Sequence, residues 1–393
     1  MALLGVPLLV LLGAVTILLP LATVLLWRRT PGGGVLTGAR RLAMVLLSQL
    51  AAVLLIAAAA NDYGYFYGSW GDLLQQVHLT SSASSTSGSG GPSRIDHISA
   101  RTTPSALTAA PATVRSTVKH LPMSAWSSPS QWAAKGRLES VTLKGSRSQL
   151  SSHAFVYLPP QYFQPAYRNV RFPATEVLTG YPGNDLNLID RMNYQGRLLT
   201  EMQAGRAKPM VLVMMRPTVV YPRDAECTDV PSGPLAETFF AEDVPAAVST
   251  TYRVRTTGWG AIGDSTGGYC SVKIVMDNSY VFSAAVGLSA YYHTLKDSTT
   301  GDLWGGSTVL RNLNDLEWQL AHRPAPPVSL LLTSSEHELG PEGLPDLRTF
   351  LALVRSPLSV STIIESHGGH NLATWDRELG PALDWLSARV TAA

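Results

Sequence analysis

Two long apolar segments at the start of the chain constrain its organisation most strongly. Residues 2–27 and 42–60 contain no charged residue. About 20 such residues in a helix cross the hydrocarbon core of a bilayer. We therefore expect a two-helix transmembrane hairpin over residues 1–61, with a loop at 28–41. A cleavable signal peptide is the alternative, but it normally begins with a basic region and has a shorter apolar core.

Arginines at 28, 29, 40 and 41 lie between the two apolar segments. Basic residues in short loops stay on the cytoplasmic side of a membrane. This predicts a multi-pass cell-membrane protein with two helices, whose remainder after about residue 61 is extracytoplasmic. Cleavage after about Ala60, in "IAAAAND", is the alternative, and it would release the rest as a secreted protein.

The two cysteines, Cys227 and Cys270, both lie in the exported part. An oxidising compartment permits a disulfide between them, and two buried free thiols are the alternative. The sequence has no Cys/His cluster at the spacing of a zinc site, so we expect neither a metal nor a cofactor. The net charge of +2 gives no basic surplus for a nucleic-acid partner.

Beyond the hairpin, the composition divides the chain into a linker and a folded domain. Residues 62–130 begin with "DYGYFYGSW", whose aromatic residues suit a membrane interface, and continue rich in Ser, Thr, Pro, Ala and Gly. Such a segment buries too little apolar surface to fold, and we interpret it as a tether. From 131 to 393, strand-like runs alternate with helix-like stretches, which predicts an α/β fold with a mostly parallel central sheet.

The strand-like runs follow the usual signals of alternation or continuous apolar character. Two near the start, "GRLESVTLKG" and "SHAFVYLPPQY", are followed by runs at 172–184, 208–217, 258–265, 281–290, 327–335 and 358–367. Helices are expected at 236–248, 267–277, 343–354 and 373–390.

The stretch "GDSTG" has the pattern Gly-x-Ser-x-Gly, with Ser265 at its centre. It lies between an apolar strand-like run and a helix-like run, which is the context of a nucleophile elbow. There the serine hydroxyl stands clear of the sheet beside a helix N-terminus that favours negative charge. We predict Ser265 as a catalytic nucleophile.

A serine nucleophile requires a base and an orienting acid, in the chain order Ser, acid, His. His370, in "SHGGHNLATW", follows the last predicted strand, and the two glycines before it allow the loop to turn back. The acid should follow the strand at 327–335, where the loop "EHELGPEG" offers Glu338 as the first choice and Glu336 as the second. The oxyanion hole would use the backbone N–H groups of Thr266 and of Tyr181, in "LTGYPGND".

Residues from about 134 to 392 resemble the α/β-hydrolase esterases of the group that includes esterase D and the antigen 85 mycolyltransferases. Together with the apolar N-terminal segments, the chain resembles an actinobacterial, membrane-anchored member of this group. The resemblance lies in "VYLPPQY", "LTGYPGN", "GDSTGG", "DLWGGSTVLRNLND" and "GGHNLATWDRELGPALDWL". It implies an α/β-hydrolase fold with the nucleophile at Ser265 and the base at His370. The acid varies in position within the group.

These observations predict a membrane-anchored serine esterase that forms an acyl-enzyme on small-molecule or lipid-like esters. An acyltransferase of the mycolyltransferase type, moving the acyl group to a sugar or another alcohol, is the alternative. A non-catalytic binding module of the cell envelope is a further one. Residues 291–326 are the expected lid or acyl-chain surface. The sequence specifies neither the two halves of the substrate nor an oligomeric state.

Overall fold

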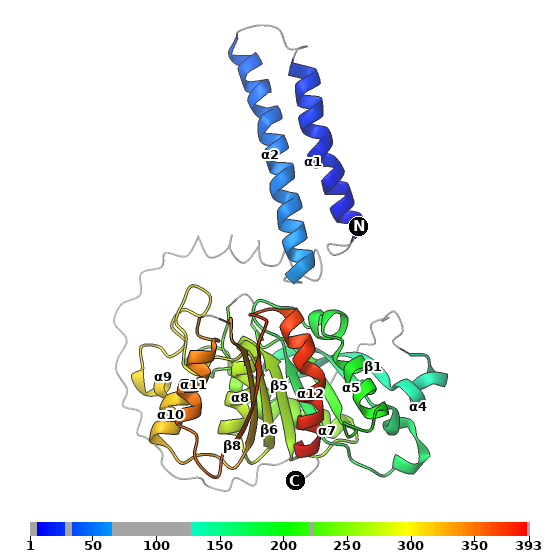
Figure 1. The fold of residues 1–393 in the computed structure, drawn as a ribbon, viewed down its shortest axis with the longest axis vertical. Coiled ribbons are helices and arrows are strands. Elements are labelled where there is room, and N and C mark those ends of the chain that lie inside the picture. Colours follow the sequence, from blue (N-terminus) through cyan, green and yellow to red (C-terminus); the bar gives the residue numbers. More distant parts are fainter. Residues whose placement is uncertain (1–5, 28–33, 65–126, 221–222, 339, 391–393) are drawn as a thin grey trace.

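The computed structural model describes residues 6–27, 34–64, 127–220, 223–338 and 340–390. Two long helices come first, α1 (Val6–Trp27) and α2 (Val35–Gly64). Figure 1 shows them as an antiparallel pair. The Thr23 and Ser48 hydroxyls lie 3.5 Å apart between the helices. By length and composition both helices can cross a membrane, a property that a signal sequence near the N-terminus shares.

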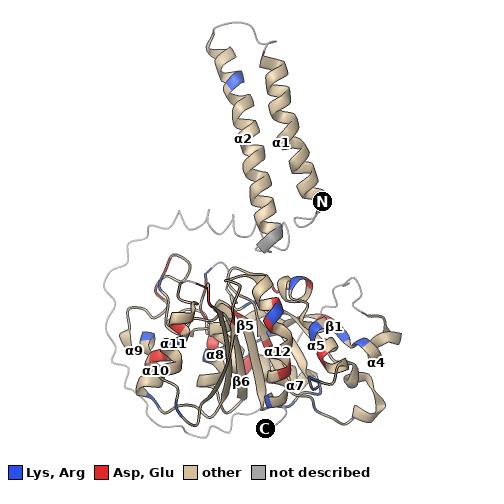
Figure 2. Ribbon diagram, in the orientation of Figure 1, with Lys and Arg blue, Asp and Glu red and all other residues tan. Residues whose placement is uncertain are grey.

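The second helix starts earlier than predicted. It begins at Val35 rather than at residue 42, so Arg40 and Arg41 lie in its first turns and not in the loop. No proline or glycine pair interrupts "VLTGAR", and arginine is a good helix former. Figure 2 shows basic residues only near this end of the hairpin among its described residues. The predicted linker and interface aromatics lie largely outside the described residues.

An eight-stranded sheet forms the centre of the domain after residue 127, in the order β1-β2-β4-β3-β5-β6-β7-β8. The antiparallel pairs are β1 with β2 and β2 with β4, and all other neighbours are parallel. The strands are β1 (Arg137–Lys144), β2 (Ser151–Leu158), β3 (Ala174–Leu178), β4 (Val211–Met215), β5 (Trp259–Asp264), β6 (Phe282–Leu288), β7 (Ser329–Ser335) and β8 (Ser359–Glu365). The predicted α/β fold with a mostly parallel sheet is confirmed, and every predicted run contains a strand.

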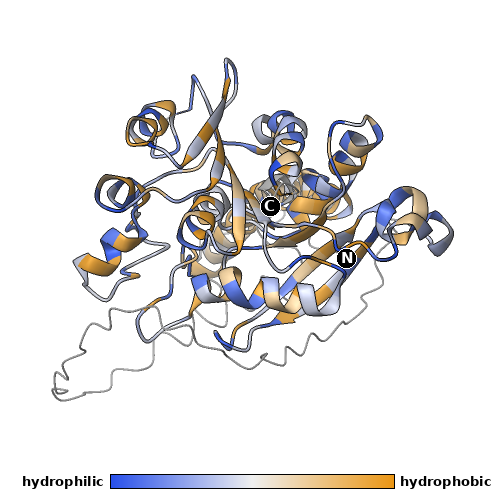
Figure 3. Cartoon of the chain, turned by 90° about the horizontal axis from the view of Figure 1, so that it is seen from below, coloured by the Kyte–Doolittle hydropathy of each residue, from blue (hydrophilic) through white to orange (hydrophobic). Residues whose placement is uncertain are grey.

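Helices cover both faces of this sheet. They are α4 (Trp132–Lys135), α5 (Tyr194–Gln203), α6 (Ala236–Thr238), α7 (Val244–Thr251), α8 (Thr266–Asp277), α9 (Thr308–Asn314), α10 (Leu316–His322), α11 (Leu344–Ala352) and α12 (Leu372–Val390). Successive residues of a strand point to opposite faces: Ala261 joins one apolar core with α7, α8 and α11, and Ile262 joins another with α5 and α12. Figure 3 shows apolar residues gathered on the strands and on parts of the surrounding helices.

The helix predicted at 236–248 is broken into three pieces. A π-helical turn, Phe239–Asp243, separates α6 from α7. Pro245, in the first turn of α7, has no backbone N–H to continue a regular helix. Asp243 at the junction accepts hydrogen bonds from the backbone N–H groups of residues 146–148 and from the Ser148 hydroxyl. The segment therefore closes the loop between β1 and β2.

Candidate active site

Four parallel strands, β3, β5, β7 and β8, end at the same edge of the sheet and bring distant residues together there. Leu178 at the end of β3 pairs with Gly263 of β5, and Ser335 at the end of β7 pairs with Glu365 of β8. The loops after these ends carry Tyr181, Ser265, Glu338 and His370. Parallel α/β sheets bind ligands at this edge.

Ser265 lies in a sharp turn between β5 and α8. Its backbone has φ 55° and ψ −124°, a conformation that costs energy for any residue other than glycine. A Cβ atom added to Gly263 would overlap the Gly267 carbonyl, and one added to Gly267 would overlap the Leu178 carbonyl. Strand, turn and helix therefore approach closely enough to require both glycines, as a nucleophile elbow does.

His370 is held by Glu338. Its Nδ1 lies 2.8 Å from Glu338 Oε1, and the Glu338 side chain is fully buried whereas that of His370 is 35 % exposed. Since a carboxylate accepts from Nδ1–H, the other ring nitrogen, Nε2, is left as the proton acceptor. Glu336 is exposed, and its backbone N–H bonds to the Glu365 carbonyl. Of the two predicted acids, the structure brings Glu338 to His370.

Electrostatic surroundings favour the charged form of His370. Burial lowers the pKa of this imidazole. The hydrogen bond to Glu338 and the charges of Glu342, Glu338 and Asp264 raise it by more than burial lowers it, so the net pKa lies above its ordinary value. An imidazole that is readily protonated can accept a proton from a serine and pass it on.

The acid accepts hydrogen bonds from the hydroxyls of Ser289 and, at 3.4 Å, Ser334. The Ser289 hydroxyl donates to Glu338 Oε2 at 3.0 Å and accepts from the Trp375 indole N–H at 2.9 Å. The Trp375 ring stands perpendicular to the His370 ring, with centroids 5.1 Å apart. This tryptophan therefore contacts the base directly and reaches the acid through Ser289. Sequence reasoning missed Ser289, because nothing in its pattern separates it from other serines at strand ends.

A pocket of about 190 Å³ opens above the end of β5. It contains Ser265 and His370 with both polar and apolar neighbours. The lining residues are Thr179, Gly180, Tyr181, Pro182, Gly183, Asn187, Asp264, Ser265, His370, Asn371, Leu372 and Trp375. The predicted lid region, 291–326, contains α9 and α10, and none of its residues lines this pocket. Among the described residues no group of His, Cys, Asp and Glu is arranged to hold a metal ion.

Both predicted oxyanion residues lie next to Ser265. Tyr181 lines the pocket from the loop after β3, and Thr266 is the first residue of α8. The N–H of Gly180, just before Tyr181, donates to Asp264 Oδ2 at 2.9 Å. Asp264 occupies the variable position of Gly-x-Ser-x-Gly, just before the serine, and this motif alone does not predict a role for it.

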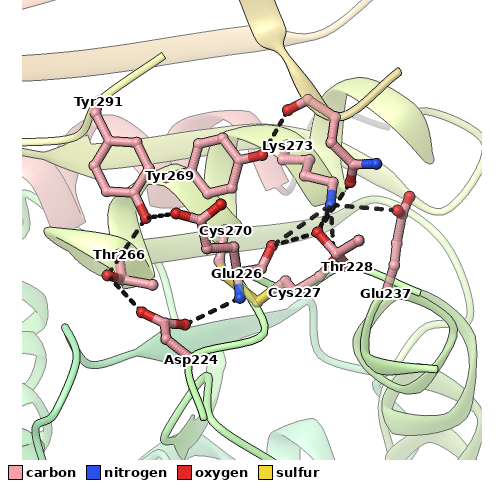
Figure 4. Close-up of a disulfide and its surroundings, with 11 residues drawn as sticks. Asp224, Glu226, Cys227, Thr228, Glu237, Thr266, Tyr269, Cys270, Lys273 and Tyr291 are labelled. Carbon is pink, nitrogen blue, oxygen red and sulfur yellow. Dashed lines mark hydrogen bonds and ion pairs between the residues drawn. A yellow bond between two sulfur atoms is a disulfide. The ribbon is translucent and has the colours of Figure 1, made fainter. Parts of the chain in front are cut away.

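A disulfide joins the nucleophile helix to the loop before α6. Cys270 of α8 and Cys227 are bonded and fully buried, 43 residues apart in the chain. Figure 4 shows the Lys273 ammonium, also from α8, directed at the same loop; it donates to the Cys227 carbonyl and to the Thr228 hydroxyl, each at 3.0 Å. The loop is therefore fixed to α8 covalently and by a buried cation.

Two buried carboxylates of this loop lie behind the elbow (Figure 4). Asp224 accepts from the Thr266 hydroxyl at 3.3 Å, and Glu226 accepts from the Tyr291 hydroxyl at 2.9 Å. Burial raises the pKa of Asp224 to about 6 and that of Glu226 to about 8. The wall of the elbow is thus polar, and its two carboxyl groups hold their protons to higher pH than exposed ones do.

The fold and the elbow are those of the α/β-hydrolase class, and comparison with known proteins gives the family. The family described as "Putative esterase" matches residues 147–386. That is well over half of the chain, and the chain belongs to this family. A search of curated protein sequences finds no match.

Several solved structures share the fold. An S-formylglutathione hydrolase from Agrobacterium tumefaciens is 14 % identical, with a TM-score of 0.54 over 65 % of this chain and 96 % of its own. A ferulic acid esterase is 16 % identical, with a TM-score of 0.54 over 65 % and 98 %. The fluorophosphonate-binding serine hydrolase F of Staphylococcus aureus is 16 % identical, with a TM-score of 0.51 over 65 % and 99 %. The chain is a carboxylic ester hydrolase with an added N-terminal pair of apolar helices.

Proposed function

We propose that the protein is a serine esterase whose catalytic triad is Ser265, Glu338 and His370. The observation that carries this proposal is the bond between His370 and the buried Glu338, at the rim of the pocket that Ser265 enters from its strained turn. Along the chain, the nucleophile, the acid and the base follow one another in the order that this fold uses.

In the proposed reaction, His370 Nε2 takes the hydroxyl proton while Ser265 Oγ attacks the ester carbonyl carbon. The carbonyl oxygen becomes an oxyanion that accepts hydrogen bonds from the backbone N–H groups of Tyr181 and Thr266. His370 then gives its proton to the leaving alcohol, and an acyl-enzyme remains on Ser265. Water, activated by the same imidazole, releases the acid and restores the serine. Glu338 stays ionised and stabilises the imidazolium.

The pocket favours a small acyl group. Its volume of about 190 Å³ is below the usual range for drug-sized ligands, and Tyr181, Pro182, Leu372 and Trp375 supply its apolar walls. We therefore expect p-nitrophenyl acetate and butyrate to be hydrolysed faster than esters of long-chain acids. Product analysis with glycerol or a sugar added separates hydrolysis from acyl transfer: a free acid as the sole product supports the esterase.

For its location, we propose that the hairpin anchors the protein in the cell membrane and that residues 62–130 tether an extracytoplasmic catalytic domain, 131–393. The Arg40 and Arg41 side chains mark the cytoplasmic end of α2. The disulfide between Cys227 and Cys270 suits an oxidising compartment. Protease added to intact cells should digest the domain, and full protection would overturn this topology.

Labelling with a fluorophosphonate probe tests the nucleophile. The wild-type protein should be labelled, and Ser265→Ala should not. Ser271→Ala is a matched control, because Ser271 is fully buried on α8, the helix that directly follows Ser265. Equal labelling of wild type and Ser265→Ala, or labelling of neither, would refute the proposal.

A further inference from the structure

Asp264 is a buried carboxylate with few hydrogen-bond donors around it. Asp264 is the last residue of β5, directly before the nucleophile, and it is 3 % exposed. Oδ2 accepts the Gly180 N–H at 2.9 Å, and Oδ1 has no hydrogen-bond partner. Placing a carboxylate here with so few donors is costly, and an apolar residue would avoid that cost. Such a residue at the centre of an enzyme site indicates a role in the reaction.

We propose that Asp264 is a positioning residue for the oxyanion hole. By accepting the Gly180 N–H, its carboxylate fixes the backbone that presents the Tyr181 N–H to the substrate carbonyl oxygen. This inference rests on the proposed esterase function. Asp264 lines the pocket, but its proposed role is exerted through the Gly180 backbone and needs no bond to the substrate.

The close approach at Gly180 supports this role. A Cβ atom there would lie 2.9 Å from Asp264 Oδ2 and 3.0 Å from Ser265 Cβ, so the glycine backbone lies directly against both side chains. Glycine has the widest choice of backbone dihedrals, and the Tyr181 N–H follows it immediately. Without a partner for the Gly180 N–H, the direction of the next N–H would be poorly fixed.

The far end of the same loop has its own anchor. Asp185 Oδ2 lies 2.5 Å from His153 Nδ1, and His153 Nε2 lies 2.7 Å from the Ser140 hydroxyl. The loop between β3 and α5 is thus held to β2 and β1 at one end and to the nucleophile strand at the other. Asp264 is the anchor nearer the reacting atoms.

The Asp264 carboxylate also acts on the base. Burial raises the pKa of Asp264 to about 6, whereas the Gly180 N–H and the positive charge of His370 lower it. In return, the Asp264 charge contributes to the raised pKa of His370. A change that removes the charge should therefore move the acid limb of the pH–rate profile to lower pH.

Two substitutions separate the acceptor oxygen from the charge. Asp264→Leu keeps the branched shape and removes the acceptor, and we expect kcat to fall about 100-fold with little change in KM, as when one oxyanion donor is lost. Asp264→Asn keeps an acceptor oxygen, and we expect kcat at high pH within about tenfold of wild type, with the acid limb at lower pH. Asp243→Asn is the matched control. Asp243 is also buried and accepts three backbone N–H groups, but these belong to the loop after β1 and not to the loop that carries Tyr181. It should lower the melting temperature and leave kcat unchanged.

A substrate with sulfur in place of the carbonyl oxygen reports on the oxyanion hole directly. Wild type should hydrolyse the oxygen ester much faster than its thiono analogue, because the N–H groups are placed for an oxyanion. Asp264→Leu should lose at least about tenfold of that preference, and Asp264→Asn should keep it.

An Asp264→Leu protein with wild-type kcat and oxygen preference, beside an inactive Ser265→Ala, would overturn this inference and leave the esterase proposal standing. An active Ser265→Ala would refute the esterase proposal itself. If Asp264→Leu does not fold, Asp264→Asn decides: an unshifted acid limb, or loss of the oxygen preference, counts against the inference.

Discussion

Replacing Glu338 by glutamine should nearly abolish turnover while leaving the fold intact. The two side chains have the same shape, so the cavity around Oε1 and Oε2 stays filled. The change removes the negative charge that lies 2.8 Å from His370 Nδ1. Ser289 donates to Oε2 and keeps its acceptor only if the amide oxygen occupies that position. The amide nitrogen then faces His370 and selects the tautomer with the proton on Nε2, which cannot accept the serine proton.

Loss of the acid in serine triads typically costs about 10⁴ in kcat. That corresponds to about 5 kcal/mol of transition-state stabilisation. The assay is the steady-state hydrolysis of p-nitrophenyl acetate, with kcat and KM determined separately. We expect the loss in kcat, because the charge acts on an imidazolium that forms only during the reaction.

Glu336→Gln is the matched control two residues away on the same loop. The Glu336 side chain is exposed. Its backbone N–H donates to the Glu365 carbonyl, and the substitution keeps that bond. Its kcat should stay within about twofold of wild type, as for most surface changes. A large loss in Glu336→Gln together with an active Glu338→Gln would refute the assignment of the acid.

Two further predictions concern pH and the disulfide. His370 acts as a base only when unprotonated, and its raised pKa keeps it protonated to higher pH, so kcat/KM should rise with pH through a midpoint above the usual histidine value of about 6.5; a midpoint at or below that value would contradict the raised pKa. The Cys227–Cys270 bond closes 43 residues of chain, and Cys227→Ala/Cys270→Ala should lower the free energy of unfolding by about 4 kcal/mol in a urea titration. Equal stability of the double variant and the oxidised wild type would show that the bond does not constrain the unfolded chain.

The strand pattern and the elbow were predictable because their signals are local. Continuous apolar runs between glycines and prolines mark buried strands, and the sequence around Ser265 places small residues where strand and helix meet. The parallel order of the strands then requires their carboxyl ends to share one edge. The juxtaposition of Ser265 and His370 in one pocket follows from that edge.

The supporting residues were not predictable, because their roles depend on contacts across the sheet. Asp264 meets Gly180 from a neighbouring strand, and Ser289 meets Glu338 from another. Neither contact leaves a periodic trace in the sequence. The choice between Glu336 and Glu338 likewise depends on which way one short loop turns. The start of α2 was misplaced because the absence of charge was taken as its boundary, although a helix can continue through arginines.

The strained backbone at Ser265 has a consequence for how sequence variation should be distributed around the site. A glycine at 265 would adopt φ 55° without strain, so a library sorted only for folded protein should accept Ser265→Gly readily. A library sorted for ester hydrolysis should reject it. Gly263 and Gly267 should be conserved in both, because any Cβ atom there meets backbone carbonyls. The elbow thus contains one position where fitness for folding and fitness for turnover diverge, between two positions where they agree.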